Sequence, residues 1–183
     1  MVTKVRIYFE GDPGLRPGFR RFLSEIAEVA RSKRCHFDVI ATEGTPVQDF
    51  RSALETHADA WNVLLLDSED PHEFQLRKQR LEGCDQNSIF WMVQIMESWF
   101  LADIEALRTV FKGSLNESAL RGNPKVEEIP KEDVMAGLKN ATNGEYHKVK
   151  HGAKLLELMD PARVRKAAPH CERMFSLILT RLH

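Results

Sequence analysis

The chain has 183 residues, of which 43% are hydrophobic and 29% are charged, and its formal net charge is -1. This length suits one substantial domain or a domain with a helical extension, and it argues against two full enzyme domains. No apolar run approaches the about 18 to 20 residues that span a bilayer, so we expect no membrane segment. The near-neutral charge argues against a protein coated in positive charge.

The amino terminus and the cysteines bear on the compartment. Residues 1–4 lead directly into a strand pattern, without the apolar segment and cleavage site of a secretory signal. Cys35, Cys84 and Cys171 are odd in number and widely dispersed, so we expect reduced thiols and no short-spaced zinc or redox motif. We therefore predict a cytoplasmic protein.

The first half of the chain alternates strand and helix patterns. In chain order we expect a strand at 4–9, a helix from Pro17 to about 33, a strand at 37–41, a helix opened by Thr45 and Pro46, a strand at 61–66, a charged helix at 71–81 and a strand at 89–94. Alternation of this kind favours a parallel sheet with right-handed crossovers and helices on its faces.

The second half shows no convincing strand. Helical spacing extends over 96–111, and after Gly113 the composition changes to Asn, Gly, Pro and charged residues, which is typical of a loop. Further helices are expected at 131–141, 153–158, 161–167 and 169–182. We predict an α/β core at 1–113 and a helical C-terminal segment at 114–183 that packs on it.

Carboxylates follow two of the hydrophobic strands. Glu10 and Asp12 come after the first strand, and Asp67, Glu69 and Asp70 come after the third. The carboxyl ends of parallel strands converge on one crevice, and Mg²⁺ commonly takes one or two carboxylates together with waters and substrate phosphates. We predict an Mg²⁺ (or Mn²⁺) site held by Asp67 and either Glu69 or Asp70, with Glu10 as general acid/base or as a further ligand. The alternative is that residues 67–70 only cap the helix that follows.

Glu97 follows the fourth strand and is expected at the same sheet edge. It is either a further carboxylate of the site or a helix-start residue at the positive end of a helix dipole. Asp103, two turns further on, is expected to be exposed or to cap a helix. Gly11, Gly14 and Gly18 form a strand-to-helix turn, which we favour over a phosphate cradle involving Arg16 and Arg20.

A basic segment near the end of the chain is a second candidate region. Lys148, Lys150 and His151 lie close to Tyr146 in the sequence. Such a cluster either holds a phosphate backbone and stabilises a charged transition state, or is a solvated loop.

The acidic clusters resemble the toprim pattern of topoisomerases, primases and related nucleases, which has a Glu after the first strand and Asp-x-Asp after a later one. The match is closer to the DUF4276 family of bacterial toprim-like proteins, and it rests on Arg6–Gly11, Leu65–Asp70, Gln94–Asp103 and Tyr146–Gly152. The resemblance covers most of the chain. The stretch Met-Glu-Ser-Trp-Phe-Leu-Ala-Asp, residues 96–103, is its most distinctive part.

The resemblance implies a toprim-like, mostly parallel sheet of about four strands flanked by helices, with a helical C-terminal segment. It also implies Mg²⁺-dependent phosphodiester chemistry on DNA or RNA and, in some members, an effector role in bacterial anti-phage defence beside an ATPase partner. From the residues themselves, the candidate catalytic residues are Glu10, Glu97, Lys148 and His151. Because Glu69 stands where the toprim pattern has its second Asp, the rival hypothesis is a catalytically silent toprim-like binding or regulatory module that docks on an ATPase or another partner.

Overall fold

The predicted strands form one parallel sheet in the order β2-β1-β3-β4. The computed structural model describes residues 2–42, 45–122 and 124–183. The strands are β1 (Lys4–Phe9), β2 (His36–Ala41), β3 (Trp61–Asp67) and β4 (Ile89–Met92). All pairings are parallel, and Ile7 of β1 lies between Val39 of β2 and Val63 of β3. Every residue of β3 is buried, as expected for a central strand covered on both faces.

Helices connect the strands and build the rest of the chain. Short 3₁₀ turns apart, they are α1 (Arg16–Phe22), α2 (Ser24–Ser32), α3 (Pro46–Thr56), α4 (Pro71–Arg80), the 3₁₀ helix η3 (Met96–Ala102), α5 (Ile104–Phe111), α6 (Lys131–Ala141), α7 (Lys148–Leu158), α8 (Pro161–Ala167) and α9 (Pro169–Leu182). Several have a proline at their first or second residue, where its missing N–H would have no intrahelical partner. Within the described ranges, no helix combines the length and apolarity that crossing a bilayer requires.

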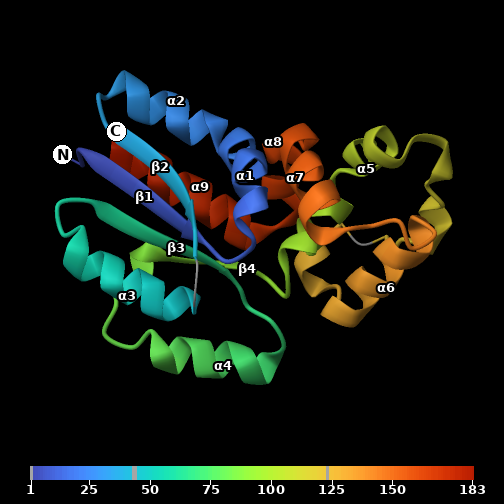
Figure 1. Cartoon of the computed structure of the whole chain (residues 1–183), viewed down its shortest axis with the longest axis horizontal. Coiled ribbons are helices and arrows are strands. Elements are labelled where there is room, and N and C mark those ends of the chain that lie inside the picture. Colours follow the sequence, from blue (N-terminus) through green and yellow to red (C-terminus); the bar gives the residue numbers. More distant parts are fainter. Residues whose placement is uncertain (1, 43–44, 123) are drawn as a thin grey trace.

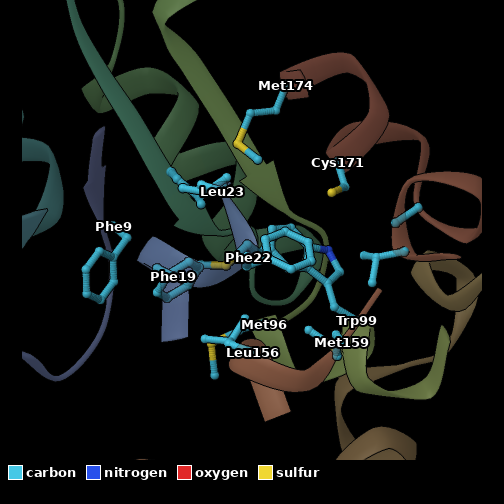
Figure 2. Close-up of a cluster of buried hydrophobic side chains, with 14 of the residues drawn as sticks. Phe9, Phe19, Phe22, Leu23, Met96, Trp99, Leu156, Met159, Cys171 and Met174 are labelled. Carbon is cyan, nitrogen blue, oxygen red and sulfur yellow. The ribbon is translucent and has the colours of Figure 1, made fainter. Parts of the chain in front are cut away.

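The sheet separates two groups of helices. α1, α2 and α9 lie on one side, while α3 and α4 lie on the other, and α5, α6 and α7 lie past the carboxyl ends of the strands (Figure 1). On the side of α1, Phe22 stacks on Trp99 with ring centroids 5.2 Å apart and meets Phe175 edge-on at 5.8 Å. Figure 2 shows this core around Phe22 and Trp99. A smaller core on the side of α3 contains Phe50 and Leu66.

A close approach of α1 and α7 ties the C-terminal segment to the sheet. A Cβ on Gly18 would lie 2.6 Å from the carbonyl oxygen of Ala153 and 2.8 Å from Cβ of Leu156, so only glycine fits there. This contact places the first turn of α7, which begins at Lys148, near the carboxyl edge of the sheet. Buried residues on both sides of residue 113 belong to one core, and the predicted boundary at that point stays a prediction.

The structure corrects several predicted boundaries in the first half of the chain. The helix expected from Pro17 to about 33 is two helices, because the backbone leaves helical geometry at Leu23 (φ -92°, ψ 17°). The fourth strand ends at Met92 instead of residue 94, since Gln94 adopts a left-handed φ of 62°.

The helix expected over 96–111 is also divided, into η3 and α5, and Asp103 lies at the junction with extended backbone (φ -132°, ψ 80°). The expectation that Asp103 is exposed or a cap is wrong. Its buried carboxylate makes no cap hydrogen bond and accepts the Asp160 N–H at 2.8 Å and Nη1 of Arg163 at 2.7 Å, so it joins this junction to the start of α8.

A last correction concerns the basic segment. The expected helix 153–158 begins five residues earlier, at Lys148, so Lys148, Lys150 and His151 lie in the first turns of α7 and not in a loop. The ring Nδ1 of His147 accepts the N–H of Lys150 at 3.3 Å and so caps this helix. A residue that satisfies an otherwise free N–H at a helix start stabilises the start there.

Candidate functional site

The carboxyl ends of β1 and β3 bring Glu10 and Asp67 together. The N–H of Glu10 donates to the carbonyl of Leu65 at 2.9 Å, which extends the β1–β3 ladder by one residue. The Glu10 carboxylate then accepts the N–H of Asp67 at 3.0 Å. With Glu69 and Glu97 these residues form what we call the acidic edge.

Asp67 is the most strongly perturbed member of the acidic edge. Its side chain is buried, with the residue only 3% exposed, and its Oδ1 accepts the N–H of Met96 at 2.8 Å. Burial raises the pKa of Asp67 well above its ordinary value, and the charges of Glu10, Glu97 and Glu69 raise it further against the opposing charge of Lys148. A carboxylate in such a position gains from any cation that replaces lost hydration.

Glu97 is buried more deeply still, at 1% exposure. Its Oε1 accepts the hydroxyl of Tyr146 at 3.1 Å and lies 3.8 Å from Nζ of Lys148. Its Oε2 is buried without a hydrogen-bond partner among the described residues. Burial and the adjacent Glu97 charge raise the pKa of the Tyr146 phenol, so this group stays protonated and donates. The distinctive sequence block around Glu97 therefore delivers an incompletely satisfied carboxylate to the acidic edge.

Arg77 of α4 neutralises Glu10. Its guanidinium donates from Nη1 and Nη2 to the two oxygens of the Glu10 carboxylate, the second at 3.1 Å, and Nη1 also reaches the carbonyl of Asp67 at 2.8 Å. Nε donates to Glu73 at 3.3 Å. Burial disfavours the charged guanidinium, but hydrogen bonds and charge from Glu10 outweigh it and raise the pKa of Arg77. A bidentate pair of this kind is both strong and directional.

The Glu69 segment combines unusual backbone geometry with a second ion pair. Glu69 and Gln94 both have left-handed φ values, 60° and 62°, and the Glu69 N–H donates to the Gln94 carbonyl at 2.8 Å. The Glu69 carboxylate pairs with Nζ of Lys131, at the start of α6. Non-glycine residues in this conformation are uncommon, and they concentrate at functional sites.

Asp70 and Asp12 serve as helix caps. Asp70 lies outside the acidic edge, and its Oδ1 accepts the N–H groups of His72 and Glu73, both at 2.9 Å, at the start of α4. The capping alternative therefore holds for Asp70. Asp12 accepts the N–H of Gly14 at 2.7 Å in the same way. Loss of such a cap typically destabilises a helix by about 1 kcal/mol.

His151 lies beside aromatic rings at the start of α7. The ring of His151 packs on Phe111 with centroids 4.9 Å apart, and its Nδ1 accepts the N–H of His147 at 2.9 Å. Burial and nearby positive charge lower the pKa of His151, which favours the neutral ring at pH 7. His151 approaches the acidic edge through Tyr146, whose ring centroid is 6.4 Å away.

The glycine turn is occupied by a local ion-pair network. Arg16 and Arg20 both donate to Oδ1 of Asp38, at 3.1 and 3.2 Å. Arg16 also donates to the carbonyl of Val39 at 2.7 Å. These contacts fasten α1 to β2, in line with the plain turn that the sequence favoured.

Sequence reasoning missed Arg77 and Lys131, which supply two of the cations at the acidic edge. Arg77 lies in a helix with no buried residue, where a charged side chain gives no periodic signal. The one available signal was its i,i+4 spacing from Glu73, which marks a helix face and not a partner elsewhere.

Among the described residues, no three His, Cys, Asp or Glu side chains stand close enough together to hold one metal ion. The donor chemistry of the acidic edge nonetheless fits a hard cation such as Mg²⁺. It consists of carboxylate oxygens, and the buried Oε2 of Glu97 lacks a partner. Arg77 and Lys131 now neutralise Glu10 and Glu69. Cation binding therefore requires these two carboxylates to exchange their present partners.

The architecture is that of a toprim-like α/β domain, with its acidic residues where the strand order reverses between β1 and β3. The model of the family described as "Domain of unknown function (DUF4276)" matches residues 13–178, so the chain belongs to the DUF4276 family. No curated protein matches the sequence.

Two solved structures share the fold. The C-terminal region of the Burkholderia pseudomallei OLD protein superposes with a TM-score of 0.56 at 11% identity, and 100% of each chain is covered. The C-terminal region of the Xanthomonas campestris pv. campestris OLD protein gives a TM-score of 0.51 at 16% identity, with 98% of each chain covered. At these identities the likeness establishes the fold, and the chemistry has to be argued from the residues of the acidic edge.

Proposed function

We propose that the chain is a metal-dependent enzyme of phosphodiester chemistry, a nuclease or phosphotransfer enzyme that acts on nucleic acid. The observation that carries this proposal is the burial of Asp67 and Glu97 at the topological switch point of the sheet, with Oε2 of Glu97 unpaired. Burying carboxylates without full compensation is destabilising. Such an arrangement is therefore expected where the charges have a chemical use.

We assign the metal to Glu10, Asp67 and Glu69, with Glu97 as a further carboxylate at its side. Mg²⁺ or Mn²⁺, when bound, would neutralise phosphate oxygens and lower the pKa of a bound water. Glu69 and Asp70 were predicted as alternative partners of Asp67, and the capping role of Asp70 at α4 supports assigning the metal to Glu69.

Lys148 is the residue placed to hold a substrate phosphate. Its side chain is half exposed, so it can meet solvent-borne phosphate while it stays 3.8 Å from Glu97. Tyr146 keeps Glu97 in position through its hydroxyl, because its phenol does not ionise near neutral pH. We keep His151 as a secondary candidate, since its lowered pKa favours a neutral ring that can accept a proton.

A cleavage assay on DNA and RNA, including structured RNA, tests the proposal. Glu10→Gln and Asp67→Asn each remove one charge of the acidic edge with little change in shape, and both should abolish Mg²⁺-dependent cleavage. Asp59→Asn is the matched control, because Asp59 is exposed and pairs with Lys4. Cleavage that survives both acidic-edge substitutions would contradict the assignment. Asp70→Asn keeps a capping side chain and so tests for a ligand role separately.

The rival function, a silent binding or regulatory module, is favoured by two observations. Arg77 and Lys131 already neutralise Glu10 and Glu69, and Asp67-x-Glu69 departs from the toprim Asp-x-Asp pattern. Such a module would show no Mg²⁺-linked rise in melting temperature and would co-purify with a partner protein. A metal-linked rise together with metal-dependent cleavage decides for the enzyme.

The family resemblance supports a wider proposal about context. We propose that the chain acts as an effector in bacterial anti-phage defence and works with an ATPase partner protein. This role is tested by measuring the survival of phage-challenged cells that express the chain with and without a candidate ATPase partner protein. Loss of protection in the Glu10→Gln variant would connect the role to the acidic edge.

A further inference from the structure

A cavity of about 620 Å³ lies between α3 and α4, next to the acidic edge. Its volume falls in the range of about 300 to 1,000 Å³ that is usual for small-molecule sites. One wall is apolar and consists of Pro46, Val47 and Leu66. Three arginines from α3 and α4 form the polar part of the lining, which we call the polar wall.

The polar wall carries a positive surplus. Arg51, Arg77 and Arg80 line the cavity, and Glu73 is the one acidic residue among the lining residues that the structure describes. Arg80 is largely exposed, and its Nη1 lies 3.9 Å from Glu73, which is too far for a hydrogen bond. Its guanidinium is therefore available to an anion.

Arg51 shapes the same wall. Its Nε and Nη2 donate to the carbonyls of Arg80 and Glu82, at 2.8 to 3.2 Å, so the side chain is fixed against the end of α4. Nη1 of Arg51 has no hydrogen-bond acceptor among the described residues. A guanidinium anchored on one side and open on the other is pre-organised to bind a phosphate or carboxylate oxygen.

The apolar wall limits the class of ligand. Leu66 belongs to the core on the side of α3, and Val47 packs against that core from the first turn of α3. A phosphate ion alone would leave this wall and most of the volume unused. A phosphate joined to a flat, largely apolar ring would use both walls.

The cavity and the acidic edge share a boundary. Arg77 lines the cavity and also holds Glu10, and Leu66 directly precedes Asp67 on β3. A nucleic-acid strand with one phosphodiester at the acidic edge could therefore place an adjacent nucleotide in the cavity. Ligands of open α/β sheets bind in this region, beyond the carboxyl ends of the strands.

We propose that the cavity is a nucleotide subsite, in which Arg51 and Arg80 bind a phosphate and Pro46 and Val47, over the buried Leu66, receive the base of the nucleotide beside the reacting linkage. The identity of the strand as substrate rests on the proposed function. Occupancy of the cavity by a nucleotide does not, because it requires neither metal nor cleavage.

The test is a calorimetric titration of the full chain in EDTA with deoxyadenosine 5′-monophosphate, deoxyadenosine and inorganic phosphate. The nucleotide should bind more tightly than either fragment. Equal affinities for the nucleotide and inorganic phosphate, or no binding of the nucleotide, would overturn the proposal. Amide shifts of Val47 and Gln48 in NMR spectra should locate the ligand at the start of α3.

Two substitutions make the test specific. Arg80→Gln removes an exposed charge and should weaken nucleotide binding about tenfold. Val47→Trp fills the apolar wall and should weaken the nucleotide more than inorganic phosphate. Arg31→Gln is the matched control, since Arg31 is exposed on α2, on the opposite side of the sheet. Nucleotide binding that is unchanged in both cavity variants would reject the site.

A competition experiment identifies the source of the nucleotide. A 5′-phosphorylated oligonucleotide should displace the mononucleotide from the wild type, and failure to do so would contradict a substrate subsite. Asp67→Asn should keep mononucleotide binding even if cleavage is lost, because Asp67 does not line the cavity. The outcomes are therefore separable, because a failed metal site removes cleavage while a failed subsite removes metal-free nucleotide binding.

Discussion

Arg77→Gln gives the sharpest test of how the acidic edge is balanced. The guanidinium of Arg77 holds both oxygens of Glu10 and also the carbonyl of Asp67. It therefore stands where a metal ion bound to Glu10 would compete with it. Glutamine keeps a polar side chain of similar reach but has no charge, so the substitution removes the competing cation.

The substitution is expected to lower the stability of the metal-free protein and to raise its affinity for Mg²⁺. The ion pair is largely buried, with side-chain exposures of 14% for Arg77 and 22% for Glu10. Loss of one partner of a fully buried pair destabilises by about 3 to 5 kcal/mol, and because water still reaches this pair we expect a loss of about 2 kcal/mol in EDTA. Opposite charges about 4 Å apart attract by about 4 kcal/mol at an effective dielectric constant near 20. Relief of even a third of this competition, about 1.4 kcal/mol, tightens Mg²⁺ binding about tenfold.

Urea unfolding, followed by tryptophan fluorescence with and without MgCl₂, measures both parts. In excess MgCl₂ the variant should gain about 1.4 kcal/mol more than the wild type from the metal, as binding linkage requires for a tenfold lower Kd. Arg80→Gln is the control, because it removes a positive charge from the same helix without a contact to Glu10. Equal metal-dependent gains in the wild type and Arg77→Gln would show that Arg77 does not compete with the ion.

Three further substitutions probe the framework. Asp67→Asn should stabilise the metal-free protein at pH 7. The raised pKa of Asp67 makes the wild type lose stability as the pH rises above about 4, by about 1.4 kcal/mol for each unit of difference between the folded and unfolded pKa. A variant that is less stable than the wild type at pH 7 in EDTA would contradict this. Asp38→Asn should destabilise the protein by about 1 kcal/mol at pH 7 and by less below a pH of about 4. Burial acts to raise the pKa of Asp38, but the two arginines of α1 lower it overall, so the ionised carboxylate stabilises the fold and this contribution is lost as the carboxylate protonates. Urea titrations at both pH values measure the difference. Gly18→Ala should destabilise by about 2 to 3 kcal/mol, since the new Cβ would lie 2.6 Å from the Ala153 carbonyl and force α1 and α7 apart; an unchanged urea midpoint would show that the helices yield freely.

The position of the acidic edge could be predicted because it depends on strand order. Hydrophobic runs located β1, β3 and β4, and the alternation with helices indicated parallel pairing. Parallel strands end at one edge, so Glu10 and Asp67 had to lie near one another whatever the packing of the remaining helices, and Glu97 was expected near them. The burial of Glu97 did not follow from this argument, because it depends on how the 3₁₀ helix η3 packs.

The cations at that edge could not be predicted in the same way. Arg77 and Lys131 reach the carboxylates from α4 and from the start of α6, and no repeat in the sequence encodes the distance between these segments and the sheet. Asp103 is another residue whose polar partners could not be predicted from the sequence. It was expected at the surface because it is charged, yet Arg163 and a main-chain N–H satisfy it in the interior. Long-range polar partners depend on tertiary packing, which hydrophobic periodicity does not describe.

The acidic edge is thus neutralised by groups that do not belong to the sheet. Arg77, Lys131 and Lys148 come from three different helices, and each faces a different carboxylate: Glu10, Glu69 and Glu97. Under the proposed function, substrate and metal bring the complementary charges, since phosphates can take over the three cations while Mg²⁺ takes over the carboxylates. Neither exchange leaves a buried charge unpaired if both occur together, whereas either one alone does. Under the proposed function, the resting ion pairs therefore keep Glu10, Glu69 and Glu97 balanced until both ligands are present, and metal binding would be linked to substrate binding.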